Sequence, residues 1–424
     1  MRIDLSRYVD PGRNGITMVP AVALSLLVFA YSTRFGSITI LAFYALWLPA
    51  FCLRPQLLLR HSGLVVVLLL IPLVATVSMV WSQSPGSSLR AGIQYGTTIF
   101  CGLVAARLVT LPNLMLGGLA GGLLILMYSS MNGSYAYDVV DGSYAFVGAF
   151  NSKNQLGYFA SLTIMFAVGV SFVYKTIWPL RLIGIAVAAY AAMLLWLSES
   201  ATSVLTIVFA VGIVIIARIL FGLAHPVRRV MILILIAVGI ALAIAALQLG
   251  VFDAILSAFN KDTTLTGRTF LWNRGITIGG EQPVLGLGYY AFWVQNNPPA
   301  EELWEQFYIT ARTGFHFHNT LIEAYVSLGL VGLVMMGALS ASLLVFSIRV
   351  MMNHHATGSA IMSAGLSLLF LVRSVVEIDF FTPCTAGSFL VPYLLLTMSD
   401  SRHAEKHIYR RRRRARNTPS AIAA

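Results

Sequence analysis

The chain has 424 residues, of which 58% are hydrophobic and only 10% are charged, and its formal net charge is +12. A soluble globular domain carries about a quarter charged residues, so this composition excludes a water-soluble protein. Apolar runs of about 20 residues recur along the chain, and each is long enough to cross a hydrocarbon layer about 30 Å thick. Because backbone groups in lipid must satisfy their own hydrogen bonds, these runs must be helices. The composition therefore predicts an all-α polytopic integral membrane protein.

In chain order, the hydropathy pattern predicts about 12 transmembrane helices. A cytoplasmic segment at 1–16 precedes spans one to nine within 17–249, and spans ten to twelve follow within 318–398. The chain ends in a polybasic tail at 399–424. The expected spans are 17–34, 36–53, 63–81, 91–109, 112–128, 155–174, 178–197, 202–221, 229–249, 318–347, 359–376 and 383–398.

Charge predicts the orientation. With the N-terminus in the cytoplasm, the inner segments hold 20 of the 28 lysine and arginine residues but only 4 of the 16 acidic residues. This asymmetry follows the positive-inside rule and predicts that both termini are cytoplasmic. The arginine run at 407–417 is interpreted as an anchor on anionic lipid. Nucleic-acid binding is disfavoured because a short tail on a membrane protein is no domain. Cys52, Cys101 and Cys384 are too dispersed to indicate a disulfide framework or a metal site.

Two outer loops collect the polar residues, one at about 129–154 and a much longer one at about 250–317. A long loop with its own short helices and aromatic residues is usually functional. This loop is expected outside the cytoplasm, where no ATP is present. Chemistry there needs a substrate that arrives already activated.

The segment TGRTFLW lies in the longer loop. Thr266 is expected to cap a helix whose first turn holds Gly267, Arg268 and Thr269. Trp272 then lies one turn beyond Arg268 on the same face. Arginine binds phosphate oxygens through its planar fork, so this pair favours a phosphate that carries a lipid tail. The alternative is an interfacial anchor, with Trp272 among the headgroups and Arg268 snorkelling.

Lys153, in FNSKNQLGYF, precedes or forms the first turn of the sixth span. The N-terminus of a helix attracts anions through its free N–H groups and its macrodipole. Lys153 is also a cation on the side that is otherwise poor in cations. We expect it to bind substrate, with an ordinary surface lysine as the alternative.

The segment FHFHNTLIEAYVSLGLVGL places His316, His318 and Asn319 at the entrance of a long apolar run. Neutral histidine accepts a proton near physiological pH and suits general-base work on a sugar hydroxyl. Asn319 is suited either to capping the helix or to orienting a partner. The alternative for the histidines is an interfacial position in which backbone and water satisfy them.

Glu323 lies one turn beyond Asn319, inside a predicted span. An unpaired carboxylate in lipid costs at least about 2.5 kcal/mol, so we expect Glu323 to face the bundle interior with a partner. Arg373, at a similar depth in the eleventh span, is the expected partner. Arg373 could instead pair with Glu377 at i, i+4. Glu377 and Asp379 form an E-x-D pair, but two carboxylates are a weak metal signal, and no metal is expected.

Cations, histidines and aromatic residues thus gather at the outer face of an apolar bundle. This pattern favours a phosphate-bearing, lipid-tailed substrate. A transporter would more typically show polar residues and broken helices near the middle of the membrane.

Three segments, GRTFLW, EQPVLGLGYYAFW and HNTLIEAYVSLGLVGL, together resemble the signature region of the O-antigen ligase and Wzy-type polysaccharide polymerase superfamily. In that family, Ser/Thr-Gly-Arg-x-x-x-Trp opens the large periplasmic loop and a His-Asn pair closes it. The match is strong over roughly 265–335, and the span count and loop position agree over most of the chain. The matching residues are Thr266, Gly267, Arg268, Trp272, Gly286, Gly288, His318 and Asn319.

Two further segments, GAFNSKNQLGYF and WLSESATSVLT, are similar to those of the ExoQ-like exopolysaccharide polymerases. O-antigen ligases commonly carry an arginine soon after the Ser-rich segment, where this chain has Ala201 and Thr202. That departure favours a polymerase over a ligase. Lys153 or Arg312 is the expected replacement for the second phosphate-binding arginine.

The resemblance implies a GT-C-like glycosyltransferase of the bacterial inner membrane that acts on undecaprenyl-pyrophosphate-linked oligosaccharide at the periplasmic face. Arg268, helped by Lys153, would neutralise the departing pyrophosphate. His318 would take the proton of the acceptor hydroxyl, and Asn319 would orient it. Trp272, His316, Glu323 and Arg373 complete the expected substrate site.

The resemblance implies no nucleotide, metal or other cofactor. The expected partners are the lipid-linked oligosaccharide, membrane lipid, and a flippase and chain-length regulator. Two alternatives remain open: a ligase that moves finished glycan onto lipid A–core, and a flippase or transporter of lipid-linked sugars.

Overall fold

The computed structural model describes residues 10–59, 62–139, 142–248, 267–353 and 358–400. The predicted polybasic tail therefore lies almost wholly outside the described residues, as do 250–266 of the long loop. A last helix covers 386–400. The other long helices are α2 (Gly15–Phe35), α3 (Ser37–Leu53), α4 (Ser62–Val77), α5 (Pro85–Leu108), α6 (Leu111–Met131), α7 (Lys153–Val168), α8 (Trp178–Leu197), α9 (Ala201–Leu220), α10 (His225–Gln248), α14 (Thr320–Met351) and α15 (Gly358–Arg373).

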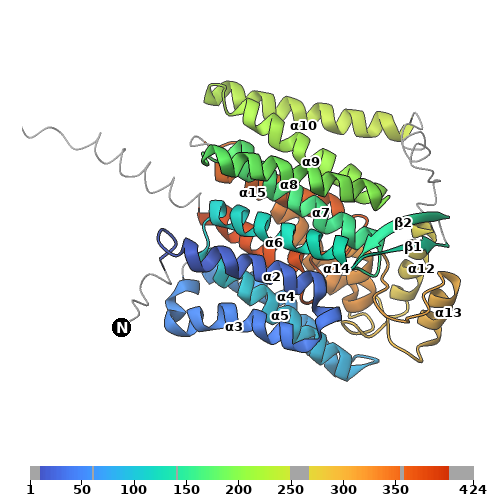
Figure 1. The fold of residues 1–424 in the computed structure, drawn as a ribbon. Coiled ribbons are helices and arrows are strands. Elements are labelled where there is room, and N and C mark those ends of the chain that lie inside the picture. Colours follow the sequence, from blue (N-terminus) through green and yellow to red (C-terminus); the bar gives the residue numbers. More distant parts are fainter. Residues whose placement is uncertain (1–9, 60–61, 140–141, 249–266, 354–357, 401–424) are drawn as a thin grey trace, which may run out of the picture.

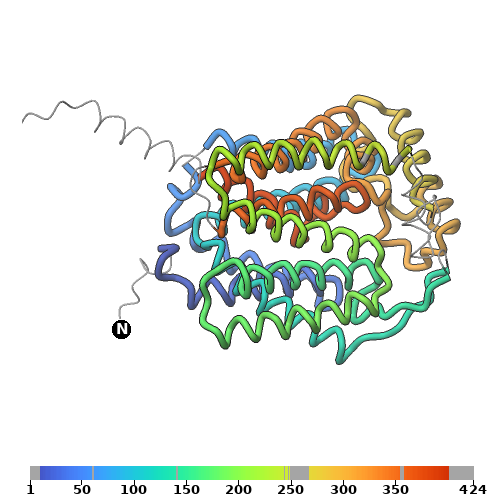
Figure 2. The backbone as a smooth tube through the Cα atoms, turned by 90° about the horizontal axis from the view of Figure 1, so that it is seen from above, coloured from blue at the N-terminus to red at the C-terminus, as the bar shows by residue number. Residues whose placement is uncertain are grey.

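The long helices lie side by side in one bundle, as both views show (Figures 1 and 2). Within the described residues, eight helices are long and apolar enough to cross a membrane. α3 and α15 are shorter apolar helices. Each of the twelve expected spans coincides with a helix, so the prediction of a mostly helical, multi-pass membrane protein is confirmed. That all twelve cross the membrane stays a prediction.

Many large apolar side chains point outward from the bundle, as expected for helices that face lipid. Ile219, Val230 and Val334 are among the most exposed. α10 lies at the edge of the bundle (Figure 1), and only 6% of its most apolar stretch is buried. The interior is packed closely where glycine permits it. A side chain on Gly121 of α6 would meet the backbone of Ala23 in α2 at 2.8 Å, which explains why these two helices can approach each other there.

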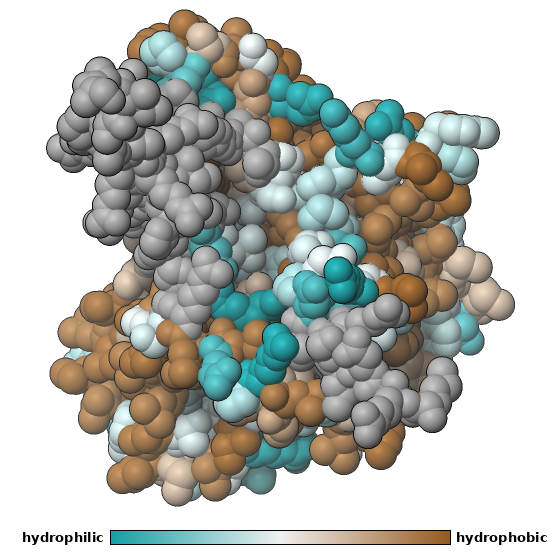
Figure 3. All heavy atoms as spheres, turned by 90° about the vertical axis from the view of Figure 1, so that its left-hand side faces the viewer, coloured by the Kyte–Doolittle hydropathy of each residue, from teal (hydrophilic) through white to brown (hydrophobic). Residues whose placement is uncertain are grey.

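One end of the bundle carries most of the non-helical chain, and we call it the loop end. It holds α12 (Arg268–Gly279), α13 (Pro298–Gln306) and a hairpin of β1 (Ser134–Asp138) with β2 (Ser143–Gly148) (Figures 1 and 2). The N-terminal end of the described chain lies at the opposite end (Figure 1). Figure 3 looks onto that opposite end, where hydrophilic residues lie toward the middle and hydrophobic residues cover much of the rim.

The hairpin corrects the prediction that the structure is entirely α-helical. Its strands are antiparallel, with Tyr137 opposite Tyr144. Aromatic residues stand on either side of an alanine in both strands, Tyr-Ala-Tyr in β1 and Tyr-Ala-Phe in β2, a period of two that suits a strand. Gly142, with a φ of 70°, lies in the turn that joins them. Tyr135 and Tyr144 stack with their ring centroids 5.4 Å apart.

α12 and α13 are held in place by a second, smaller core at the loop end. Its fully buried aromatic residues are Trp304 of α13, Phe292 and Phe317. The ring of Phe292 lies 5.2 Å from that of Phe317, just before α14. From residue 267 on, the long loop is therefore a packed layer over the bundle, and its last residues lead directly into α14.

α14 is broken at Gly329, whose φ of 61° is not helical. The broken turn is paired with the segment 283–288. The Leu330 N–H donates to the Pro283 carbonyl at 2.8 Å, and the Gly288 N–H donates to the Ser327 carbonyl at 2.9 Å. A side chain on Gly286 would lie 2.5 Å from the Gly329 nitrogen. Irregular backbone inside a bundle needs such protein partners, so the long loop and the broken helix form one unit. The span expected at 318–347 thus consists of two helical parts that meet at Gly329.

Candidate active site

Three segments that are distant in the sequence meet at the loop end. They are the start of α12 with Arg268, the residues just before α14 with His316 and His318, and the turn after α15 with Glu377. α12 begins at Arg268, and Gly267 is its N-cap with a φ of 80° and no side-chain cap. The expectation that Gly267 lies in the first turn is therefore corrected: Gly267 takes the cap position, because glycine adopts the left-handed conformation without strain. Thr266 lies outside the described residues, so its expected capping role stays a prediction.

The guanidinium of Arg268 joins two parts of the bundle. One nitrogen lies 2.9 Å from Oε1 of Glu377, and another donates to the hydroxyl of Thr202 at 3.3 Å. Thr202 lies in the first turn of α9, within the Ser-rich segment. Trp272 follows one turn along α12, and its indole N–H is buried with no hydrogen-bond partner among the described residues.

The two histidines face the other oxygen of the same carboxylate. Nδ1 of His318 lies 3.4 Å from Oε2 of Glu377, and Nε2 of His316 lies 3.7 Å from it. The backbone N–H of His318 donates to Nδ1 of His316 at 3.0 Å. Because Nδ1 of His316 accepts this bond, a neutral His316 carries its proton on Nε2. Glu377 therefore touches both histidines and Arg268 at once.

Burial and charge set the protonation of this cluster. Burial lowers the pKa of His318 from its ordinary value, while Glu377 opposes that shift. Burial also lowers the pKa of His316, well below its ordinary value. For Glu377, burial acts to raise the pKa, but His318 and Arg268 together lower it below the usual range of a glutamate. The cluster at neutral pH thus holds one carboxylate, one guanidinium and two neutral imidazoles.

His318 has a φ of 50°, in the left-handed region that non-glycine residues rarely adopt. Such strain persists only where the surroundings fix it. Asn319, the next residue, is the N-cap of α14, and its Oδ1 accepts from the N–H groups of Leu321 and Ile322. Its Nδ2 donates to the Val375 carbonyl at 2.9 Å. Both ends of the Asn319 amide are thus engaged in holding the start of α14 against the turn after α15.

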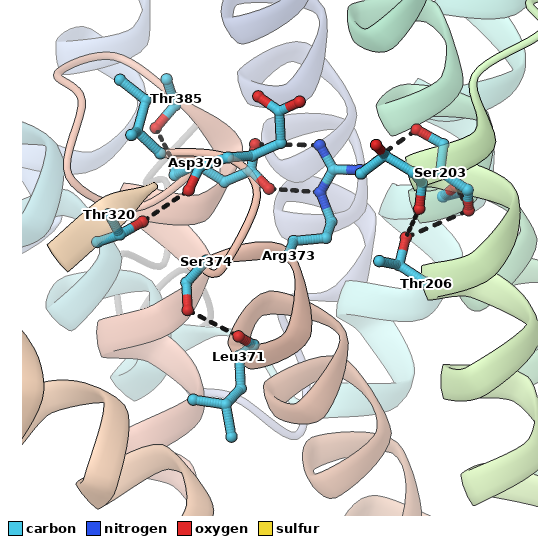
Figure 4. Close-up of polar contacts among 12 residues, drawn as sticks. Ser203, Thr206, Thr320, Leu371, Arg373, Ser374, Asp379 and Thr385 are labelled. Atoms are coloured by element: carbon cyan, nitrogen blue, oxygen red, sulfur yellow. Dashed lines mark hydrogen bonds and ion pairs between the residues drawn. The ribbon is translucent and has the colours of Figure 1, made fainter. Parts of the chain in front are cut away.

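The expected ion pair between Glu323 and Arg373 is wrong. Glu323 folds back over the start of its own helix, where its Oε2 accepts from the Phe317 N–H at 2.9 Å. Arg373 instead pairs with Asp379 and donates to Ser203 of α9 at 3.3 Å (Figure 4). Its guanidinium also lies over the ring of Tyr158, 4.4 Å from the centroid. Arg373 is therefore bound to partners within the bundle, namely Asp379, Ser203 and the ring of Tyr158.

The alternative pairing of Arg373 with Glu377 at i, i+4 is also not formed. α15 ends at Arg373, so the helical spacing does not extend to Glu377. The chain turns there, and the carboxylate of Glu377 points to Arg268 instead. Two acids follow Arg373 in the sequence. Only the geometry of the turn shows that Glu377 pairs with Arg268 and that Asp379 pairs with Arg373.

Lys153 begins α7 as expected, with Ser152 as the N-cap. Its ammonium binds Asp138 at 2.9 Å and Ser143 at 2.7 Å, which ties α7 to the hairpin. The next residue, Asn154, accepts a hydrogen bond from Ser200 at 2.8 Å. Hydroxyls continue the chain of contacts from Ser200 to Ser203 and on to Arg373. These contacts begin at the residue next to Lys153, whereas the ammonium of Lys153 itself binds the hairpin.

Arg312 is not brought to the cluster. It pairs with Glu301 at 2.9 Å and with Glu305 at 3.9 Å, both on α13, and about half of its side chain is exposed. Its expected role as a second phosphate-binding arginine has no support from these contacts. Of the predicted residues, Arg268, His316 and His318 come together. Trp272 lies on α12 with Arg268, while Asn319 and Glu323 belong to the start of α14, directly after the two histidines.

Glu377 is the central residue that the sequence did not single out as part of the site. Its only sequence signal is an acid soon after Arg373 at the end of an apolar run. Atoms of His316, His318 and Glu377 lie within 4.8 Å of one another, close enough to hold a metal ion. However, Nδ1 of His316 is already a hydrogen-bond acceptor, and Arg268 occupies the other oxygen of Glu377. This arrangement suits proton handling better than metal ligation.

Comparison with known proteins agrees with this architecture. A family model described as O-Antigen ligase matches residues 185–337, a stretch that contains Arg268, His316 and His318. This match and the apolar helices together define the class, which is a multi-pass membrane protein with an O-antigen ligase domain. The chain is also 41% identical over 395 residues to the exopolysaccharide production protein ExoQ of Rhizobium meliloti (strain 1021), covering 92% of this chain and 90% of that protein. The chain belongs to the O-antigen ligase family, in its ExoQ-like branch.

Proposed function

We propose that the protein polymerises undecaprenyl-pyrophosphate-linked oligosaccharide repeat units into exopolysaccharide at the periplasmic face of the bacterial inner membrane. The loop end then faces the periplasm, and both termini are cytoplasmic. The relative that is named for exopolysaccharide production supports the product class. The observation that carries the proposal is the cluster in which Arg268 and His318 share one buried carboxylate at the loop end.

In the proposed reaction, a hydroxyl of the acceptor sugar attacks the anomeric carbon of the sugar linked to pyrophosphate. A new C–O bond forms, the bond to the pyrophosphate oxygen breaks, and the lipid pyrophosphate leaves with the electron pair. Nε2 of His318 takes the proton of the hydroxyl. Arg268 neutralises the charge that develops on the departing phosphate. The glycosyl–pyrophosphate bond supplies the energy, so no nucleotide takes part.

The other expected residues support this centre in different ways. Asn319 fixes the start of α14 and with it the position of His318. Lys153 orders the hairpin beside the site rather than touching Arg268, so its contribution to phosphate binding is indirect. A flippase that delivers repeat units and a chain-length regulator are the partners such a polymerase needs.

The test uses purified protein in liposomes with lipid-linked repeat units as the only substrate. The wild type should produce a ladder of lengthened glycans, and His318→Ala should produce none, because no other group replaces the base. His225→Ala is the matched control, since His225 bonds the Met352 carbonyl away from the site. A normal ladder from His318→Ala contradicts the proposed role of His318.

The same assay separates the two other candidate functions. Product that appears only after lipid A–core is added, as a single transfer, identifies a ligase. For a transporter, the wild type makes no new glycosidic bond, and the His318 and Arg268 variants fail to bring lipid-linked units to the outer leaflet. The proposed polymerase instead leaves that delivery unchanged.

A further inference from the structure

Glu377 occupies the centre of the cluster without a part in the reaction as described above. Its side chain is 7% exposed, so its charge is almost fully removed from solvent. One oxygen, Oε1, binds Arg268, while Oε2 faces His318 and His316. An ionised carboxylate in such a place is stable only with partners. The partners here are the two groups that we assign to leaving-group stabilisation and proton transfer.

The contact with Glu377 decides which nitrogen of His318 carries the proton. A carboxylate only accepts hydrogen bonds, so the nitrogen that faces Oε2 must be the donor. That nitrogen is Nδ1 of His318, which is buried, lies 3.4 Å from Oε2 and has no hydrogen-bond partner among the described residues, so this carboxylate is the acceptor open to it. The neutral imidazole then has its lone pair on Nε2. His316 is less suited to act as the base, because the lone pair of its Nδ1 already accepts a hydrogen bond from the backbone N–H of His318.

We propose that Glu377 is a positioning residue of this reaction, which fixes the proton of His318 on Nδ1, leaves Nε2 as the base and holds Arg268 beside it. The inference rests on the proposed glycosyl transfer. When the acceptor hydroxyl gives its proton to Nε2, His318 becomes an imidazolium whose Nδ1–H still points to Oε2. The carboxylate stays ionised throughout and stabilises the new positive charge.

The charged neighbours explain why a carboxylate is needed at this point. Arg268 is a permanent cation that disfavours a second positive charge on His318. His316 lies beside the same oxygen, with its ring centroid 4.0 Å from that of His318. Arg373 and Asp379 face Glu377 from the other side and pair with each other. Glu377 therefore provides the negative charge that lets His318 accept a proton next to Arg268.

The backbone around Glu377 is held independently of its side chain. Its carbonyl accepts from the hydroxyl of Thr320 at 2.8 Å, and the Thr320 N–H donates to the Ser374 carbonyl at 2.9 Å. These contacts join the turn after α15 to the start of α14. A change from carboxylate to amide at Glu377 keeps them, so Glu377→Gln is expected to fold and to insert in the membrane.

The test measures the rate of glycan extension against pH in liposomes for the wild type, Glu377→Gln and the control Glu302→Gln. Glu302 is an exposed acid on α13 that pairs with Arg274. The wild type should lose activity only as the pH falls below about 6.5, the ordinary pKa of histidine, because burial lowers the pKa of His318. Glu377→Gln should be slower by at least about 100-fold, as for other carboxylates that orient a catalytic histidine.

The pH profile distinguishes positioning from a merely structural role. Without the negative charge, His318 is harder to protonate, so the acid limb of the profile should move to lower pH in Glu377→Gln. Added formate should restore part of the activity of Glu377→Ala, because it returns a carboxylate to the cavity. A variant that folds with an unchanged rate and acid limb overturns the inference. The inference is also overturned if Glu377→Gln is slow but keeps the wild-type acid limb and formate does not restore the activity of Glu377→Ala.

The assay also keeps the inference separate from the proposed function. A wild type that makes no glycosidic bond under any of the conditions overturns the proposed function and the inference with it. A wild type that extends glycans, together with a Glu377→Gln variant that matches Glu302→Gln, overturns the inference alone. If the wild type transfers glycan only to lipid A–core, the same pH profiles test Glu377 in that reaction.

Discussion

Arg268 reaches Thr202 and Glu377 through different nitrogens of one guanidinium, which fixes the plane of its fork. Lysine keeps the charge but presents a single compact ammonium, so it cannot hold both partners in this geometry. Charge-assisted hydrogen bonds contribute about 1.5–3 kcal/mol each. The plane of the guanidinium, and not only its charge, is therefore expected to matter for a phosphate leaving group.

Arg268→Lys should lower kcat/KM for glycan extension by about 10- to 100-fold, which corresponds to one lost charge-assisted bond in the transition state. The measurement is the initial rate with lipid-linked repeat units in liposomes. Arg274→Lys is the matched control, because Arg274 also lies on α12 but pairs with the exposed Glu302. Equal rates for the two variants contradict a specific role of the Arg268 fork.

The family resemblance predicts Arg268 and His318 for one site, because that family has their motifs at the two ends of one loop. The third member, Glu377, lies 109 residues from Arg268 in the chain, and no spacing rule connects them. Glu323 and Arg373 illustrate the opposite error. Their similar depth in the membrane suggested a pair, but the direction in which each side chain leaves its helix cannot be read from depth alone.

At the scale of elements, the pairing of segment 283–288 with the broken turn of α14 is a close backbone contact between loop and bundle. Gly286 has a φ of 65°, and its Cα lies against the backbone of Gly329 and Leu328. Any side chain there must either clash or push the two segments apart. The glycines of the EQPVLGLG motif thus serve this contact, whereas they were first noticed only as part of a family pattern.

Gly286→Ala should destabilise the protein by about 1–3 kcal/mol, because it adds both left-handed strain and a contact of 2.5 Å with backbone. Thermal unfolding in detergent should show a lower Tm. Gly337→Ala, in the same α14, is the control, since a side chain there meets nothing within 4 Å. That control should unfold at the wild-type temperature or above it, and a matching Tm for Gly286→Ala would contradict the close contact.

The hydropathy pattern predicts an outer loop at 129–154, and the structure places a hairpin there. The alternation of aromatic residues with alanine in Tyr-Ala-Tyr and Tyr-Ala-Phe is present in the sequence. A two-stranded hairpin is marginal by itself, however, so its existence depends on neighbours. The ion pair between Lys153 and Asp138 and the packing of Phe146 supply them. Such tertiary support has no signature in a hydropathy profile.

For the whole molecule, hydropathy predicted most of the helices because lipid imposes a simple rule on the backbone, while the orientation that charge predicts stays a prediction. The helices occur where the apolar runs are, and the described part of the long loop lies at the end of the bundle opposite the start of α2 (Figure 1). The break in α14 escaped this reasoning, since Gly329 lies in a continuous apolar run. Only its pairing with a distant loop reveals it.

The proposed orientation can be measured with single cysteines in a background in which Cys52, Cys101 and Cys384 are replaced by alanine. Glu302→Cys on α13 should react with a membrane-impermeant maleimide in cells whose outer membrane is permeabilised, because the loop end is proposed to be periplasmic. Gln56→Cys, which is exposed at the opposite end, should react only after the inner membrane is also opened. The reverse pattern would contradict cytoplasmic termini.

The pairing of 283–288 with α14 also bears on how members of this family can be recombined. A loop transplanted from a relative that handles a different sugar would meet a foreign broken helix, and the backbone bonds at Pro283 and Ser327 would have to form between unmatched halves. Functional chimaeras should therefore exchange 267–331 as a single block. By the same reasoning, the long loop produced alone as a soluble fragment would lack the broken turn of α14 with which its segment 283–288 pairs.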